Sequence, residues 1–348
     1  MAELTYICFW SRLNGAYSFA VRLAAVCGLV LACVSDVCAD EIPARMAFWE
    51  SKAFSCSDAG APFPSKETPG GEGQSSTCDA GDMTFFNGLL CAAGESRGCD
   101  GVKRAQGPDG RWWRSPAHIG KEATSGTYDV SFSPDMARGV LLYAVETNDV
   151  AAFRSWVQWI DKARPCVVKV GGTCLLQGWP RLCTDDVKDK RCTFRPTTCN
   201  DLELVGKRLG VPEADICRRV LKTFQIRDDY IIPTTELAAG SAVVNESGYP
   251  MHLAGAEIFM IDKLGLTSVY SRAGAVALAL REPMNPFFMY LAEGPTQKVK
   301  DLVLQLCPTP EKPSRVRHQW AWEREAAEKA WEESMYWDCY FMGKLLGY

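Results

Sequence analysis

The segment between residues 109 and 118 gathers side chains that are well suited to holding a flat or charged ligand. Asp109 and Gly110 predict a turn, and the prolines and glycines around them keep the segment out of a helix. Indole faces stack on sugar rings, and guanidinium groups offer planar donors to carboxylates or sulfates. In the alternative interpretation, the tryptophans fill the core and the arginines make cation–π contacts. The predicted substrate-binding residues are Arg111, Trp112, Trp113, Arg114 and His118.

Two carboxylates bracket a short segment that leads into an apolar helix. Asp129 lies before this segment, and Asp135 falls in the first turn of the helix, with Ser133 placed as its N-cap. Asp135 could simply complement the helix dipole. A carboxylate at the mouth of a buried helix is also where a helical barrel would place an acid or a base. Asp129 and Asp135 are therefore candidate catalytic carboxylates.

His252 is the third candidate catalytic group. Tyr249 opens a predicted helix, which puts His252 in its first turn and Glu257 about one turn further on. A single histidine is most often a hydrogen-bonded structural residue, and three histidines in the whole chain argue against a histidine-rich metal site. No Cys-x2-Cys spacing, nucleophile elbow, phosphate loop, dinucleotide fingerprint or His-Glu-x-x-His motif occurs. We predict neither a metal nor a cofactor.

The N-terminal residues have the pattern of an export signal. An apolar run over 23–32 is too short to span a bilayer, and a small-residue cleavage pattern ends at Ala39. We predict a signal peptide over residues 1–39. Two alternatives remain open: a lipid anchor at Cys33, because the residues before it loosely resemble a lipobox, and a retained membrane anchor.

Cleavage after Ala39 would leave twelve of the sixteen cysteines. An even number of cysteines behind an export signal is typical of an oxidising compartment, so we predict a secreted or periplasmic protein with up to six disulfides. Five cysteines fall within 166–199, so at least one must pair elsewhere, and Cys217 is the nearest candidate. The candidate disulfide cysteines are Cys56, Cys78, Cys91, Cys99, Cys166, Cys174, Cys183, Cys192, Cys199, Cys217, Cys307 and Cys339.

The composition excludes several classes of protein. A hydrophobic content of 47% and eleven tryptophans indicate a globular chain rather than a disordered one. The formal net charge is only -4, and no basic cluster predicts binding to nucleic acid. No segment after the signal approaches the roughly 18 apolar residues of a membrane-spanning helix.

The elements that position the candidate residues are mostly helices. Dense apolar runs over 83–92 and 135–145 predict buried helices. A turn at Asn148 and Asp149, followed by apolar residues at helical spacing from Phe153, predicts an antiparallel helical hairpin. Further helices are predicted at 201–209, 212–224, 250–264, 268–281, 286–293 and 296–306, with a long C-terminal helix from about 313.

These features predict three parts along the chain. Residues 1–39 form the signal, and residues 40–81 form an irregular segment pinned by a disulfide. Residues 82–348 form a single, mainly helical domain with a cysteine-rich insertion at about 165–200, which includes a short strand hairpin through 166–170.

Consecutive helical hairpins, acids at helix starts and Trp/Arg-rich loops resemble the α/α-toroid (six-hairpin) glycan-active enzymes, which include glycosidases and polysaccharide lyases. The resemblance covers about 82–306, and no diagnostic motif is matched. It implies a cleft at one end of a helical ring, with carboxylates at inner-helix ends and aromatic side chains as sugar platforms. The matching positions here are Asp129 and Asp135 as carboxylates and Trp112 and Trp113 as platforms.

We therefore expect an exported glycan-processing protein, either a polysaccharide hydrolase or a lyase. Hydrolysis would use two carboxyl groups. A lyase would use a base such as His252, with Arg111 or Arg114 neutralising a uronate. The alternative is a non-catalytic, disulfide-braced binding or interaction protein of the cell envelope, and the expected partner is a polysaccharide or another glycan.

Overall fold

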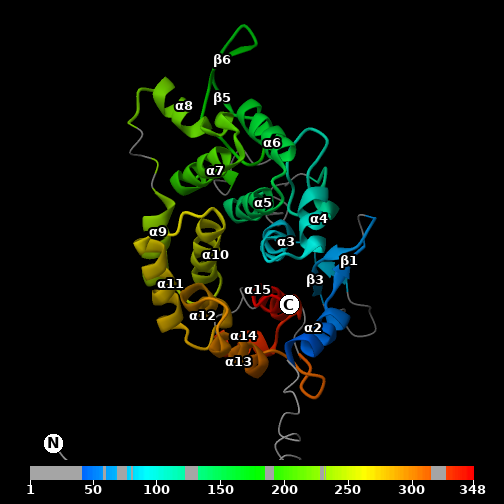
Figure 1. The fold of residues 1–348 in the computed structure, drawn as a ribbon. Helices are drawn as coiled ribbons and strands as arrows, with labels where there is room; N and C mark the ends of the chain where they lie inside the picture. Colours follow the sequence, from blue (N-terminus) through cyan, green and yellow to red (C-terminus); the bar gives the residue numbers. More distant parts are fainter. Residues whose placement is uncertain are drawn as a thin grey trace, which may run out of the picture. The chain divides into compact units, whose positions relative to one another are not determined.

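The computed structural model describes residues 41–57, 60–68, 77–79, 81–121, 132–184, 192–227, 231, 233–314 and 327–348 (Figure 1). Within these ranges the fold is mainly helical, with short antiparallel two-stranded sheets, which confirms the predicted fold class. Residues 42–348 form one compact unit. The toroid arrangement implied by the resemblance stays a prediction. The predicted signal over 1–39 lies outside the described residues, as does Cys33.

The first helix occupies part of the segment that was predicted to be irregular. α2 (Glu41–Lys52) buries Trp49, whose indole Nε1 donates to the carbonyl oxygen of Pro308 at 2.8 Å. The irregular assignment of 40–81 is wrong for α2, because the Gly/Pro-rich composition begins only after residue 56. The remainder forms antiparallel pairs of β1 (Ser55–Cys56) with β2 (Phe63–Pro64) and of β3 (Lys66–Thr68) with β4 (Thr77–Asp79).

Two buried helices, α3 (Met83–Ala92) and α5 (Pro134–Thr147), cross with their backbones in close contact. A Cβ atom on Gly88 would lie 2.3 Å from the Gly139 carbonyl oxygen, and one on Gly139 would lie 2.1 Å from the Thr84 carbonyl oxygen. Only glycine allows so close an approach. The crossing places Gly139, in the second turn of α5, against Thr84 and Phe85 in the first turn of α3.

The predicted turn between two helices is confirmed at the end of α5. Asn148 adopts a left-handed conformation with φ 53°, which ends α5. The Asp149 side chain then accepts a hydrogen bond from the Ala152 backbone N–H at 3.0 Å and caps α6 (Val150–Lys162). A further helix, α4 (Ser96–Arg104), follows α3 and is joined to it by a disulfide.

The cysteine-rich insertion contains the predicted strand hairpin. β5 (Cys166–Val170) pairs antiparallel with β6 (Thr173–Gln177). α7 (Pro196–Leu209) begins five residues before the predicted start at 201, because Pro196 occupies its first turn. The predicted helix at 212–224 is divided into a 3-10 turn, η4 (Pro212–Ala214), and α8 (Ile216–Thr223).

The helices after residue 233 match the predicted ranges closely, apart from one that the sequence analysis did not predict. That helix is α9 (Thr234–Val244), which packs against α11. The predicted helices are α10 (Tyr249–Lys263), α11 (Val269–Arg281), α12 (Pro286–Glu293) and α13 (Gln297–Leu306).

The C-terminal helix is broken where the sequence predicted a continuous one. α14 (Ala327–Glu332) and α15 (Trp337–Leu345) are separate, and Tyr336 between them has φ 72°. A side chain at positive φ cannot continue a right-handed helix. The aromatic side chains of α15, Trp337, Tyr340 and Phe341, are buried.

All twelve predicted cysteines are paired, and each is joined to the next cysteine along the chain. Cys199 bonds to Cys217, as the odd count in the insertion predicted. Such a set of disulfides indicates an oxidising compartment. No helix within the described residues is long and apolar enough to cross a membrane. The pairs are Cys56–Cys78, Cys91–Cys99, Cys166–Cys174, Cys183–Cys192, Cys199–Cys217 and Cys307–Cys339.

Candidate functional site

A group of charged side chains lies where α5, α7 and α10 meet. Arg138, one turn after Asp135 on α5, donates through Nη2 to Glu257 Oε2 on α10 at 2.7 Å. Its Nη1 also donates to the Leu253 carbonyl oxygen at 3.4 Å. The side chains of the pair are only 11% and 10% exposed. The pair is therefore a buried one, in which each charge depends on the other.

Asp201 on α7 adds another acid to the group. Its Oδ1 accepts a short hydrogen bond from the hydroxyl of Thr234, the first residue of α9. Asn200 Nδ2 donates to the same hydroxyl oxygen at 2.6 Å. Since the hydroxyl has one proton, the amide of Asn200 fixes it toward Asp201. Asp201 itself is buried.

The three acids of this group are harder to ionise than usual. Burial, followed by the charge of Glu257, raises the pKa of Asp201 well above its usual range. Burial also raises the pKa of Glu257, against the attraction of Arg138. Burial raises the pKa of Asp135 as well, and Arg138 again opposes it. The charge of Arg138 therefore acts on all three carboxyl groups and opposes each rise.

Two atoms of the buried group have no hydrogen-bond partner within the described part of the chain. They are Arg138 Nε and Glu257 Oε1. Buried polar atoms in folded proteins almost always have a partner. These two atoms therefore mark a position suited to a water or to a polar atom of a ligand.

Asp82 and Asp135 form the half-buried edge of the group. Asp82 immediately precedes α3 and forms an ion pair with Arg114. The Tyr249 hydroxyl donates to Asp135 Oδ2 at 3.5 Å, and the charges of Asp82 and Arg114 both act on Asp135. One carboxyl group is ion-paired while the other has a raised pKa. Acid–base catalysis uses such a division of roles between neighbouring carboxyl groups.

Comparison of the chain with protein-family models, with curated proteins and with solved structures gives no match. The function must therefore be inferred from the geometry of the site. Within the described residues, no group of three His, Cys, Asp or Glu side chains is arranged to hold a metal ion.

The predicted aromatic platforms lie in the core. Trp112 is 0% exposed, and its indole Nε1 donates to the Val102 carbonyl oxygen at 2.7 Å. Its ring packs edge-to-face against Trp156 at 5.7 Å. Trp113 is also buried, and the guanidinium of Arg111 lies 3.8 Å above its ring. This burial leaves neither indole face for a sugar, and Arg111 is a cation–π partner as in the alternative interpretation.

His252 is a buried structural residue in this arrangement. Its Nδ1 lies 2.9 Å from the Gly248 carbonyl oxygen and its Nε2 lies 3.0 Å from Asn285 Nδ2. A carbonyl only accepts, so Nδ1 carries the proton and Nε2 accepts from the amide. Burial lowers the pKa of His252 to about 4, which keeps the ring neutral. Both ring nitrogens are therefore engaged inside the protein.

The structure thus brings together only part of the predicted set. Asp135 and Arg114 lie at the acidic group, whereas His118 hydrogen-bonds through Nδ1 to Ser115 Oγ at 2.7 Å in a separate 3-10 turn. Asp129 lies outside the described residues. Asp82 is an acid that the sequence analysis did not single out, and only its place directly before the apolar run over 83–92 could have drawn attention to it.

Arg138, Glu257 and Asp201 were not predicted as site residues, although each is a charged residue within a buried helix. Arg138 interrupts the apolar helix three residues after Asp135, which places both on one face. Glu257 interrupts an apolar helix in the same way, and Asp201 lies next to a buried leucine on α7. A single charged residue inside a buried helix requires a polar or charged partner. Three such residues on different helices therefore indicate that the three lie together.

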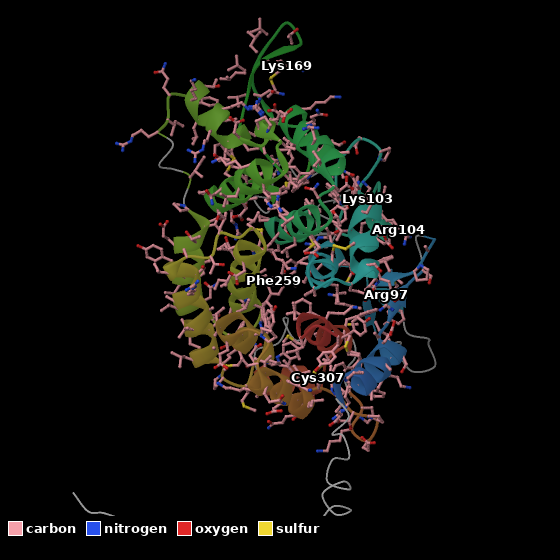
Figure 2. All side chains as sticks on the ribbon, viewed as in Figure 1. Arg97, Lys103, Arg104, Lys169, Phe259 and Cys307 are labelled. Carbon is pink, nitrogen blue, oxygen red and sulfur yellow. A yellow bond between two sulfur atoms is a disulfide. The ribbon has the colours of Figure 1, made fainter. Side chains whose placement is uncertain are left out.

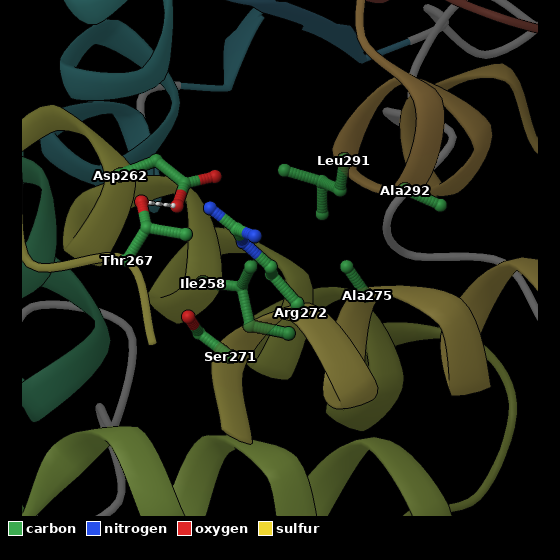
Figure 3. A pocket seen from close by; sticks show the side chains of 8 residues that line it. All are labelled: Ile258, Asp262, Thr267, Ser271, Arg272, Ala275, Leu291 and Ala292. Carbon is green, nitrogen blue, oxygen red and sulfur yellow. Dashed lines mark hydrogen bonds between the residues drawn. The ribbon is translucent and has the colours of Figure 1, made fainter. Parts of the chain in front are cut away.

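A separate hollow of about 380 Å³ lies among α10, α11 and α12 (Figure 3). Asp262 there accepts a hydrogen bond from the Thr267 hydroxyl at 2.6 Å, and burial raises the pKa of Asp262. Arg272 also lines the hollow, and Leu291 and Ala292 form its apolar side. This hollow contains none of the acidic group around Arg138.

Proposed function

We propose that this chain is a glycan-cleaving hydrolase that works by acid–base catalysis at Asp82 and Asp135. The observation that carries the proposal is the pairing of two half-buried carboxyl groups at neighbouring helix starts in unlike environments. Asp135, with its raised pKa, serves as the general acid that protonates the leaving oxygen. Asp82, which is ion-paired with Arg114, serves as the base or nucleophile.

The buried layer behind this pair supports the assignment. Burial is the largest influence on Asp135 and raises its pKa, against the attraction of Arg138. Glu257 Oε1 and Arg138 Nε, which have no hydrogen-bond partner within the described residues, provide polar contacts for a bound hydroxyl group. A polyol such as a sugar matches this mixture of donors and acceptors.

Hydrolysis is favoured over elimination by the state of the other candidates. His252 is neutral, and both its nitrogens have partners inside the core, so it does not serve as a lyase base. Arg111 covers Trp113, and Arg114 is paired with Asp82, so each guanidinium is engaged by the protein itself. Neutralisation of a uronate by these arginines would break existing contacts.

A non-catalytic binding protein is the second candidate. The burial of Trp112 and Trp113 favours it, because glycan-cleaving clefts usually offer exposed aromatic rings and these rings are covered. Such a protein would bind a glycan at the same acidic group without turnover.

The oxidised protein should be screened against neutral and acidic polysaccharides for new reducing ends, across a range of pH. We expect Asp135→Asn and Asp82→Asn to lower turnover by about 10²–10⁴-fold. Asp135→Asn should change the unfolding free energy by no more than about 1 kcal/mol, since it removes only a helix-start acid. Glu236→Gln, an exposed acid in the first turn of α9, is the matched control and should keep full activity. Glycan binding that survives in Asp135→Asn with no turnover in the parent protein would support the second candidate.

A further inference from the structure

The β5–β6 hairpin is a rigid projection that carries none of the acidic group. Gly171 and Gly172 form its turn with φ of 55° and 87°, the pair of positive values that a tight two-residue hairpin turn requires. A disulfide between Cys166 and Cys174 ties the two strands together. At its base the Gly178 N–H donates to the Pro165 carbonyl oxygen at 2.7 Å. In Figure 1 the hairpin extends beyond the neighbouring helices α6 and α7.

Large apolar side chains are exposed on both faces of this hairpin. Val167 and Val170 are each 59% exposed, Val168 is 42% exposed and Leu175 is 64% exposed. Successive side chains of a strand point to opposite faces, so Val168 and Val170 lie on one face of the hairpin and Val167 lies on the other. The two faces therefore both present apolar surface, and all five side chains of β5 are exposed.

The hairpin carries a positive charge. Lys169 is the one charged residue within 166–177, and Arg164 at the base of the hairpin is paired with Asp161 at 2.9 Å. Lys169 lies on the exposed strand β5 among the valines (Figure 2). An exposed apolar surface with a cation and no anion is complementary to an apolar medium bordered by negative charge.

We propose that the β5–β6 hairpin seats in the interface of a bilayer that contains anionic phospholipids. A protein groove would cover one face of a two-stranded hairpin, whereas a bilayer surrounds both faces, which matches the exposure of valines and a leucine on opposite sides. The outer edges of β5 and β6 have unpaired backbone groups, so the hairpin stays at the depth of the headgroups, where water and lipid oxygens pair with them. The Lys169 ammonium reaches the phosphates while its stem lies along the apolar layer.

The rigid base makes this binding favourable. Arg164 donates to the Gln177 side-chain oxygen at 2.8 Å and to the Gly178 carbonyl oxygen at 3.4 Å, so the hairpin is already ordered before it meets a surface. Less conformational entropy is then lost on binding. The inference is independent of the proposed hydrolysis, because the hairpin shares no residue with the acidic group.

The test is flotation of the oxidised, full-length mature chain with large unilamellar vesicles. Vesicles of phosphatidylglycerol and phosphatidylcholine should bind the protein, and vesicles of phosphatidylcholine alone should bind it much less. Val170→Ser/Leu175→Ser should lower the partition coefficient by about tenfold or more. Lys169→Glu should lower it by about fivefold or more, with a weaker effect at high salt.

The control variant is Val244→Ser/Leu280→Ser, which removes two side chains that are each 77% exposed on α9 and α11. This variant should bind vesicles like the parent protein. The hairpin variants should keep the parent melting temperature, because the exposed strand supports no core. The proposal is overturned if the parent protein binds neither vesicle, or if the control variant loses binding as much as Val170→Ser/Leu175→Ser does. Binding to a purified envelope protein with no vesicle binding would assign the hairpin to a protein partner instead.

Discussion

Replacing Arg138 by methionine would remove the cation that pairs with Glu257 and leave that carboxylate buried. The Nη2–Oε2 distance is 2.7 Å, and both side chains are about nine-tenths buried. Removing one partner of a buried pair typically costs about 3–5 kcal/mol, because the other charge is left without compensation. We expect a loss in this range for Arg138→Met at pH 8.

The size of the loss should depend on pH. In the variant, the pKa of Glu257 rises further because its attraction to Arg138 is gone. A carboxyl group whose folded pKa is raised stabilises the protein while it is protonated, and this contribution is lost as pH rises toward the folded pKa. Each pH unit in that window is worth about 1.4 kcal/mol. The loss at pH 5.5 should therefore be smaller than at pH 8 by about 2 kcal/mol or more.

Urea unfolding of the oxidised proteins, followed by circular dichroism at the two pH values, measures both quantities. The double variant Arg138→Met/Glu257→Gln should recover most of the stability at pH 8, since no charge is then left unpaired. Lys298→Met is the control, because its ion pair with Glu293 is exposed and should be worth less than about 1 kcal/mol. A loss that is the same at both pH values, or a double variant as unstable as Arg138→Met, would refute this account of the acidic group.

Further predictions concern packing, titration and cross-links. Gly139→Ala should destabilise the protein by about 3 kcal/mol, because its Cβ would meet the α3 backbone, whereas Gly240→Ala on α9 has open space and should cost nothing; equal melting temperatures would contradict this. The free energy of unfolding should fall by up to about 3 kcal/mol as pH drops from about 6.5 to 4, because in this range His252 binds a proton only in the unfolded chain. In urea titrations, His252→Gln should not show this pH dependence. Replacing Cys199 and Cys217 by alanine should lower the free energy of unfolding by about 3 kcal/mol, since the bridge closes a separation of 18 residues. An unchanged urea midpoint would contradict this contribution.

The sequence predicts most helices here because their apolar residues follow helical spacing. Thr234–Val244 was missed since its alanines, glycine and valines form no distinct stripe, and only packing against α11 selects its inner face. The break at Tyr336 was missed because nothing in the local sequence demands a positive φ there. In both places tertiary packing, rather than local preference, determines the structure.

The site was predictable only in part. Asp135 could be proposed because it stands alone at the start of a buried helix. Its partners Asp82, Asp201 and Glu257 come from other helices, and no local pattern shows which helix ends meet. Trp112 looked like a ligand platform because a loop position does not reveal that the indole is covered by Trp156.

The pairing of each cysteine with its next neighbour has a consequence for how the chain matures. The two cysteines of each pair are separated by 8 to 32 residues, and no unpaired cysteine lies between them. Once the predicted signal and its four cysteines are removed, a chain that emerges N-terminus first into an oxidising space would therefore present each of these twelve thiols with its correct partner before any competitor appears. Cross-linking in order of emergence leads directly to the native set, so maturation of this chain needs an oxidant and no reshuffling of wrong pairs.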